Sequence, residues 1–213
     1  MRTVLAYGDS NTHGTAPMTG ADARARFGPG LRWTGHARGL LPADTVLIEE
    51  GHPGRTTVHD DPVEGAHRNG LTILPAILES HRPLDLVILM LGTNDMKARF
   101  SVTPEDVAAS LDRLIRVIRA AEAGPDRGAP QILLVCPPPV QETGCLQGMF
   151  RGGAAKSAAL APLAEAVALA HGARFLDAGA HIAVSPLDGV HFDAGAHATL
   201  GRAIGELAAG MLG

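Results

Sequence analysis

The sequence predicts an α/β protein in which helices cover both faces of a five-stranded parallel sheet, a three-layer αβα sandwich. Two observations lead to this fold class. Candidate strands and candidate helices alternate along all 213 residues, and such alternation is typical of parallel strands joined by right-handed helical crossovers. The strand candidates are also nearly continuous apolar runs, as a sheet covered on both faces requires.

The strand candidates are short aliphatic segments at 2–7, 44–49, 84–91, 131–136 and 173–176. Helix candidates lie between and after them at 33–41, 70–80, 104–122, 153–171 and about 192–212. The helix from 104 has the clearest start, because Thr103 can cap it and Pro104 suits its first turn. We find no repeat, linker or low-complexity segment, so we expect one domain over residues 1–213.

Composition excludes several classes of partner. The net charge is −4 and no basic stripe is present, which argues against nucleic acid. No apolar run approaches the roughly 20 residues of a membrane-spanning helix, so we expect no membrane partner. The chain enters a strand without a signal-peptide pattern, which favours the cytoplasm. Two cysteines do not make a disulfide framework.

The loops that follow the strands carry the functional signal. Parallel strands end at one edge of the sheet, which is where open α/β sheets bind ligands. Ser10 follows the first strand, but a serine hydroxyl is a weak nucleophile unless a base activates it. The segment from Gly8 to Asn11 is equally typical of a turn with a helix cap. The segment alone leaves both interpretations open.

A candidate base precedes the last helix. Asp188 and His191 have Asp-x-x-His spacing, which allows the carboxylate to orient the imidazole and stabilise its protonated form. The alternative is an acid in a turn beside an exposed histidine. Candidate oxyanion donors are the N–H groups of Ser10 and Gly54 and the side-chain amide of Asn94. Gly54 and Asn94 can also serve only as turn and cap residues.

Taken together, these residues resemble the SGNH hydrolases, also called GDSL-type esterases. The four hallmark blocks occur in order, as Gly8-Asp9-Ser10-Asn11, Gly54, Gly92-Thr93-Asn94-Asp95 and Asp188-Gly189-Val190-His191. Other segments resemble the bacterial arylesterase/acyltransferase branch, among them Arg32-Trp33-Thr34-Gly35, Glu49-Glu50-Gly51, Arg55-Thr56-Thr57 and Pro137-Pro138-Pro139. The resemblance covers nearly the whole chain.

The resemblance implies a flavodoxin-like sheet and a cofactor-free serine esterase or acyltransferase that acts on small acyl esters. It implies Ser10 as nucleophile, His191 as general base and acid, and Asp188 as the residue that orients His191. Ser10, Gly54 and Asn94 would form the oxyanion hole, and the acyl acceptor would be water or an alcohol. Because that branch includes oligomers whose subunits narrow the site, the resemblance leaves room for a homo-oligomer.

The sequence departs from the family pattern at three positions near the expected site. Asn11 stands where the name-giving motif has leucine, His13 where we expect tryptophan, and Gly54 where we expect alanine. The segment 141–150 also matches that branch poorly. These differences leave the catalytic residue types in place and bear on substrate preference and subunit packing.

Other functions stay open at this point. With the same triad the chain could be a carbohydrate O-acetylesterase, a thioesterase or a lysophospholipase. A non-catalytic binding module is disfavoured, because the serine loop has neither a Gly-x-Gly-x-x-Gly pattern nor a Lys-Ser/Thr pair. A zinc enzyme would have to use His191, Asp193 and His197, whose spacing is not typical of a metal site.

Overall fold

Five parallel strands form one sheet in the order β2-β1-β3-β4-β5. The computed structural model describes residues 1–213. Its strands are β1 (Arg2–Gly8), β2 (Thr45–Gly51), β3 (Leu86–Met90), β4 (Gln131–Cys136) and β5 (Arg174–Asp177). Its α-helices are α1 (Ser10–His13), α2 (Trp33–Arg38), α3 (Gly70–His81), α4 (Pro104–Ala120), α5 (Gly153–Ala158), α6 (Leu160–Ala170) and α7 (Ala194–Leu212). This strand order is flavodoxin-like, so the predicted fold class is confirmed.

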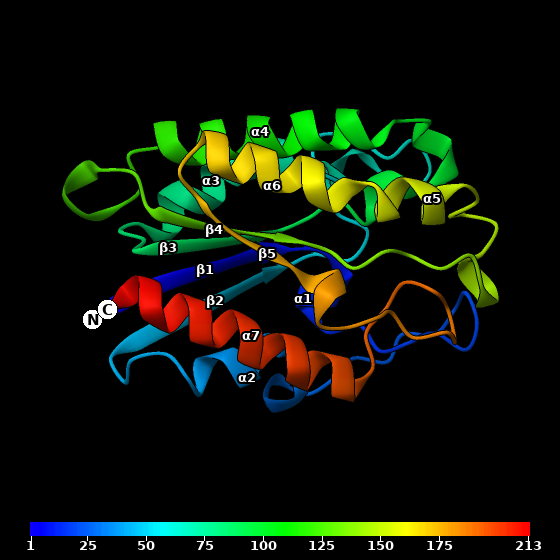
Figure 1. Ribbon diagram of the computed structural model, residues 1–213, viewed down its shortest axis with the longest axis horizontal. Coiled ribbons are helices and arrows are strands. Elements are labelled where there is room, and N and C mark those ends of the chain that lie inside the picture. The colour runs from blue at the N-terminus through cyan, green and yellow to red at the C-terminus, as the bar shows by residue number, and fades with distance from the viewer.

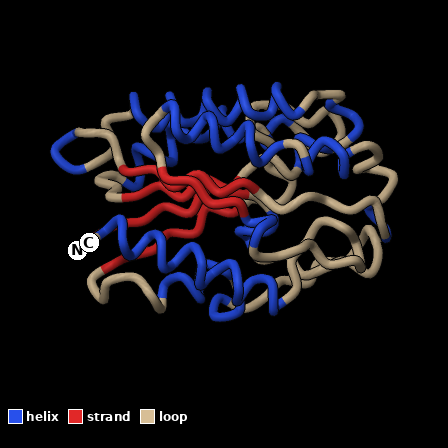
Figure 2. Tube along the Cα trace, in the orientation of Figure 1, coloured by secondary structure: helices blue, strands red, loops and turns tan.

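Helices cover both faces of the sheet (Figure 1). Helices α2 and α7 lie on one face, and α3, α4 and α6 lie on the other; the tube view shows the strands between these two layers (Figure 2). Side chains along β1 alternate between the two cores: Leu5 and Tyr7 belong to one, whereas Val4 and Ala6 belong to the other. Because successive side chains of a strand point to opposite faces of the sheet, β1 contributes to both cores.

The sequence misses the first helix, predicts too long a second helix and predicts one helix where the structure has two. Helix α1 begins at Ser10, after its cap Asp9, where we expected a turn with a helix cap but no separate helix. Helix α2 ends at Arg38 rather than at 41, because Gly39 follows it. The helix expected over 153–171 divides at Ala159. The break puts Pro162 into the first turn of α6, where its missing N–H removes no helical hydrogen bond.

One segment corrects our expectation about membrane-spanning length. Residues Gly153–Ala170 have a mean hydropathy of 1.2 over 18 residues, which by length and composition alone would suffice to cross a membrane. In the structure this segment is divided between α5 and α6, and Leu160, Ala164 and Ala168 are buried in the protein core. The core helix of a globular protein can meet the same criteria of length and hydropathy.

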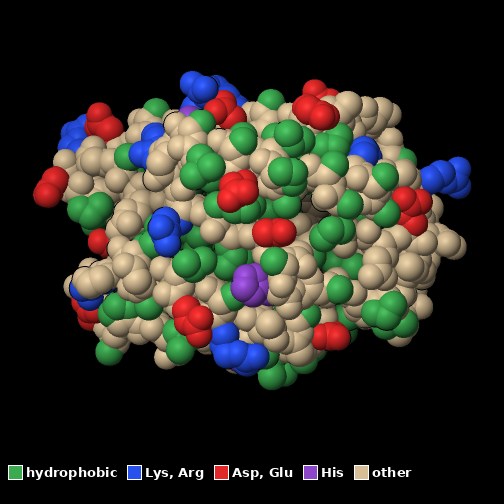
Figure 3. Space-filling model, in the orientation of Figure 1, with side chains coloured by type: hydrophobic (Ala, Val, Ile, Leu, Met, Phe, Trp, Pro, Cys, Tyr) green, Lys and Arg blue, Asp and Glu red, His purple; other side chains and the backbone are tan.

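Figure 3 shows acidic and basic side chains interspersed over one face of the molecule.

Candidate active site

Ser10 lies at the carboxyl end of β1, at the start of α1. Asp9 caps that helix, since its Oδ1 accepts the Asn11 N–H at 2.9 Å. Gly8 permits the tight turn from strand to helix: a Cβ there would lie 2.1 Å from Thr12 Oγ1 and 3.0 Å from Met90 O. The hydroxyl of Ser10 is thereby presented at the edge of the sheet beside the neighbouring β3.

The structure brings Ser10, His191 and Asp188 together in one hydrogen-bonded chain. His191 Nε2 lies 3.1 Å from Ser10 Oγ, and His191 Nδ1 lies 2.7 Å from Asp188 Oδ2. All three residues are buried. This is the arrangement in which an imidazole accepts the serine proton while a carboxylate fixes its tautomer.

Four donors surround the carboxylate of Asp188. Oδ1 accepts the N–H groups of Val190 at 3.0 Å and of His191 at 2.9 Å. Oδ2 accepts the Met18 N–H at 2.7 Å in addition to the contact with the His191 ring. Burial alone would raise the pKa of Asp188, but the hydrogen bonds from His191 and Met18 outweigh it and lower the pKa to about 2. The group is therefore held as an anion behind the imidazole.

Asn11 connects the serine turn to the histidine loop. Its Nδ2 donates to Val190 O at 3.1 Å, and its Oδ1 accepts the Phe192 N–H at 3.2 Å. These two peptide groups flank His191 on either side. Sequence reasoning noted Asn11 only as a departure from the family motif. The signal that could have drawn attention to it is an amide in place of an aliphatic residue next to the nucleophile, since a buried amide needs partners.

The three expected oxyanion donors line one cavity with His191. Ser10, Gly54 and Asn94 all contact this cavity, whose volume is about 410 Å³. The N–H groups of Ser10 and Gly54 donate no hydrogen bond within the protein, so both remain free for a ligand. Asn94 differs from them. Its Nδ2 donates to Asp9 Oδ2 at 3.2 Å and to Arg55 O at 3.1 Å, so both amide hydrogens already face acceptors.

Two buried acids brace these loops. Burial raises the pKa of Asp9 to about 6, although its hydrogen bond from the Asn11 backbone opposes the shift. Burial also raises the pKa of Asp95, which accepts hydrogen bonds from the Thr57 backbone at 3.0 Å and hydroxyl at 2.5 Å. Neither carboxylate is among the residues that line the cavity, in keeping with the bracing role that the family resemblance implies.

The cavity has an apolar wall and an ionic wall. Its apolar side chains come from the segment after α1, from the segment 141–150 that precedes α5 and from the loop that carries His191; they include Met18, Leu146, Met149, Phe150 and Val190. Its ionic side chains include Glu64, Arg68 and Lys97. Sequence reasoning did not predict the ionic wall, because it depends on how the loop between β2 and α3 folds back over the site.

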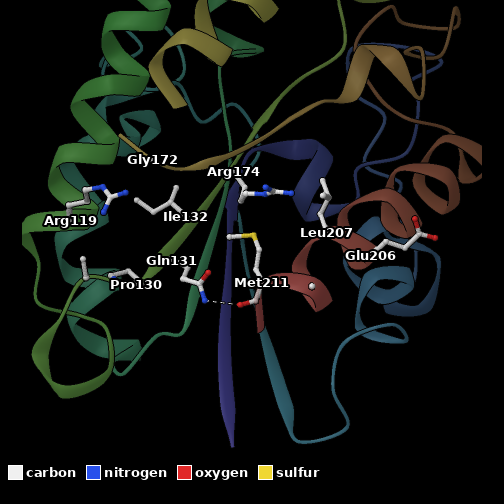
Figure 4. A pocket seen from close by; sticks show the side chains of 11 residues that line it. Arg119, Pro130, Gln131, Ile132, Gly172, Arg174, Glu206, Leu207 and Met211 are labelled. Carbon is white, nitrogen blue, oxygen red and sulfur yellow. Dashed lines mark hydrogen bonds between the residues drawn. The ribbon is translucent and has the colours of Figure 1, made fainter. Parts of the chain in front are cut away.

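A larger cavity, of about 590 Å³, lies at the amino-terminal ends of β4 and β5 (Figure 4). Its two arginines do not converge, since Arg119 extends toward Ile132 whereas Arg174 extends toward Leu207. Gln131 donates a hydrogen bond to Met211 O at 2.8 Å across it. With no serine, cysteine or histidine in its lining, it offers no alternative to the serine site.

The zinc hypothesis does not match the geometry. His191 is engaged by Asp188 and Ser10. His197 Nδ1 faces the Trp33 N–H at 3.2 Å, and Asp193 caps α7 by accepting the Ala196 N–H at 2.8 Å. The three side chains serve different partners, and nowhere do three or more His, Cys, Asp or Glu side chains group as metal ligands.

Comparison with known proteins agrees with this architecture. The model of the GDSL-like lipase/acylhydrolase family matches residues 6–199, whereas no curated protein matches the chain. The aryl esterase of M. smegmatis is 39% identical, with a TM-score of 0.94 over 99% of this chain and 100% of that one. A carbohydrate acetylesterase from Sinorhizobium meliloti is also 39% identical, with a TM-score of 0.95 over 99% and 100% of the two chains. The chain therefore belongs to the SGNH, or GDSL-like, hydrolase family and is a carboxylic ester hydrolase.

Proposed function

We propose that the protein cleaves small acyl esters through an acyl-Ser10 intermediate and passes the acyl group to water or to an alcohol. The observation that carries the proposal is the contact of 3.1 Å between His191 Nε2 and Ser10 Oγ, with Asp188 2.7 Å behind the ring. The names of the solved relatives, an aryl esterase and a carbohydrate acetylesterase, support an ester of a small alcohol or phenol as substrate.

In the first half-reaction His191 Nε2 takes the Ser10 proton as Oγ attacks the ester carbonyl carbon. The carbonyl oxygen becomes an anion. It accepts hydrogen bonds from the free N–H groups of Ser10 and Gly54 and from the side-chain amide of Asn94. Collapse breaks the bond to the alcohol oxygen, which takes the proton from His191 and leaves acyl-Ser10. Loss of one oxyanion donor typically costs about 3 kcal/mol of barrier.

In the second half-reaction an acceptor attacks acyl-Ser10. His191 removes a proton from water or from an alcohol, the same donors stabilise the second oxyanion, and Ser10 leaves with the proton. The apolar wall formed by Leu146, Met149 and Phe150 supports transfer to an alcohol, because an alcohol gains more than water does from contact with apolar surface.

Replacement of the nucleophile tests the proposal. Ser10→Ala should abolish turnover of p-nitrophenyl acetate while circular dichroism and the unfolding midpoint stay close to those of the wild type. Mass spectrometry after treatment with a sulfonyl fluoride should place the label on Ser10. Transfer is measured by adding ethanol and quantifying ethyl acetate against acetic acid. Wild-type activity in Ser10→Ala would refute the mechanism, and the absence of ethyl acetate would refute the transfer step alone.

A further inference from the structure

We infer that Glu64 and Arg68 form a subsite beside Gly54 that recognises a hydroxyl group on the substrate, close to the reacting ester. This inference rests on the proposed function, because the subsite lines the same cavity as Ser10 and His191. It assigns a role to two side chains that neither the triad nor the oxyanion hole uses.

The first observation is the packing around Gly54. A Cβ on this residue would lie 2.7 Å from Glu64 Oε2 and 3.1 Å from Arg68 Nε. The missing side chain therefore leaves room for an acid and a guanidinium next to a proposed oxyanion donor. Gly54 has a φ of +75°, a conformation that also favours glycine. The alanine expected from the family branch would require the Glu64 carboxylate to shift from this position.

The second observation is that both groups have hydrogen-bonding capacity to spare. Arg68 Nη1 donates to Pro53 O and contacts His52 Nδ1 at 3.2 Å, and Nε is buried without a hydrogen-bond partner. Nη2 is not buried in this way and donates no hydrogen bond within the protein. Glu64 Oε2 lies 3.6 Å from Arg68 Nε, which is an ion pair but not a hydrogen bond. Glu64 Oε2 and Arg68 Nη2 thus provide a free acceptor and a free donor in the lining of one cavity.

The third observation is that Glu64 is fixed in place. Its Oε1 lies 2.7 Å from the ammonium of Lys97, a side chain that is only 3% exposed and also pairs with Asp61. Arg99 contacts the same Oε1 at 3.6 Å. A carboxylate held from behind in this way presents its second oxygen in one direction, which is the preorganisation that recognition requires.

The charges of the subsite select the chemistry of its ligand. A substrate carboxylate would meet Glu64, and a substrate ammonium would meet Arg68 and Lys97, so either ion is repelled by one half of the subsite. A hydroxyl is both donor and acceptor. It can donate to Glu64 Oε2 and accept from the Arg68 guanidinium.

The hydroxyl can belong to the alcohol part or to the acyl part of the ester, and matched substrates separate the two. The alcohol arm compares 2-hydroxyethyl acetate with propyl acetate, and the acyl arm compares methyl glycolate with methyl propanoate. Within each pair only a hydroxyl replaces a methyl group. We expect the wild type to favour the hydroxylated ester in one arm by about tenfold in kcat/KM, a typical gain for a hydrogen bond to a charged group.

Two variants test the assignment. Glu64→Gln and Arg68→Lys should each reduce the hydroxyl preference, the ratio of kcat/KM values in that pair, to within about twofold of unity. The matched control Glu79→Gln changes an exposed carboxylate on α3 and should keep the wild-type ratio. The ratio is informative even where absolute activity falls.

The outcomes separate this inference from the proposed function. A wild type without hydroxyl preference in either arm, or Glu64 and Arg68 variants that keep it, would overturn the subsite alone. Turnover of p-nitrophenyl acetate by Ser10→Ala would overturn the proposed mechanism instead, whatever the ratios are.

Discussion

Asp188→Asn should inactivate the protein by changing the tautomer of His191. The substitution keeps the shape of the side chain but leaves one acceptor oxygen where the structure has two. Each carboxylate oxygen of Asp188 accepts two donors. The new amide nitrogen must therefore face one of these pairs of donors.

The two orientations of the new amide differ in free energy. With its oxygen at the Oδ1 position, the amide keeps the N–H groups of Val190 and His191 but leaves the Met18 N–H without an acceptor. The reverse orientation abandons two backbone donors, so it is disfavoured by about 1–3 kcal/mol, the usual penalty for one unsatisfied buried group. In the favoured orientation the amide donates to His191 Nδ1. The ring proton must then sit on Nε2, which points at Ser10 Oγ and can no longer accept its proton.

Such a change of tautomer lowers kcat on the order of 10⁴-fold, or about 5 kcal/mol of barrier. The assay is the steady-state hydrolysis of p-nitrophenyl acetate, together with urea unfolding to measure stability. Asp193→Asn is the matched control, because Asp193 is a nearby carboxylate that caps α7 and asparagine caps helices equally well. If Asp188→Asn retained kcat within about tenfold of the wild type, the reasoning would be wrong.

Three further predictions concern the surroundings of the triad. Asn11→Leu should lower the free energy of unfolding by about 1–3 kcal/mol and reduce kcat more than it changes KM, because the peptide groups on either side of His191 lose their hydrogen bonds to Asn11. Urea unfolding measures the first effect and steady-state kinetics the second. An unchanged kcat would contradict a positioning role for Asn11. Gly54→Ala should lower kcat, because its Cβ would lie 2.7 Å from Glu64 Oε2. A second substitution, Glu64→Ala, should restore part of the lost kcat. If kcat did not recover, backbone strain at residue 54 alone would explain the loss. Burial raises the pKa of Asp9 from 3.8 to about 6, so the folded protein binds this proton more tightly than the unfolded chain, and ionisation of Asp9 lowers stability as pH rises from about 4 to 6, by up to about 3 kcal/mol. The difference in unfolding free energy between Asp9→Asn and the wild type should therefore shift in favour of the variant over this range, and a pH-independent difference would contradict it.

The fold and the convergence of the triad could be predicted from the sequence for one physical reason. Parallel strands end at a common edge, so residues that follow different strands meet there however far apart they lie in the chain. Ser10 follows β1 and Asn94 follows β3, which are neighbours in the sheet. His191 lies in the segment that follows β5 and precedes α7, so the same rule brings it to this edge.

The supporting contacts could not be predicted, because they depend on loops without periodicity. The Met18 N–H reaches Asp188 through the segment between α1 and α2. Glu64 and Arg68 reach Gly54 through the loop between β2 and α3. The segment 141–150, which matches the family branch poorly, packs on the histidine loop, where the Gln141 N–H donates to Gly189 O at 2.8 Å. Neither hydrophobic patterning nor residue propensity specifies such paths.

The engagement of Asn94 bears on which species the site stabilises in the proposed mechanism. While the protein is free, the carboxylate of Asp9 and the carbonyl of Arg55 occupy the two amide hydrogens. A neutral ester oxygen is too weak an acceptor to draw a hydrogen away from a carboxylate, whereas a fully developed oxyanion can compete for it. Asn94 would thus contribute little to holding the intact ester and much to the tetrahedral species, so that the internal competitor itself makes this donor selective for the transition state.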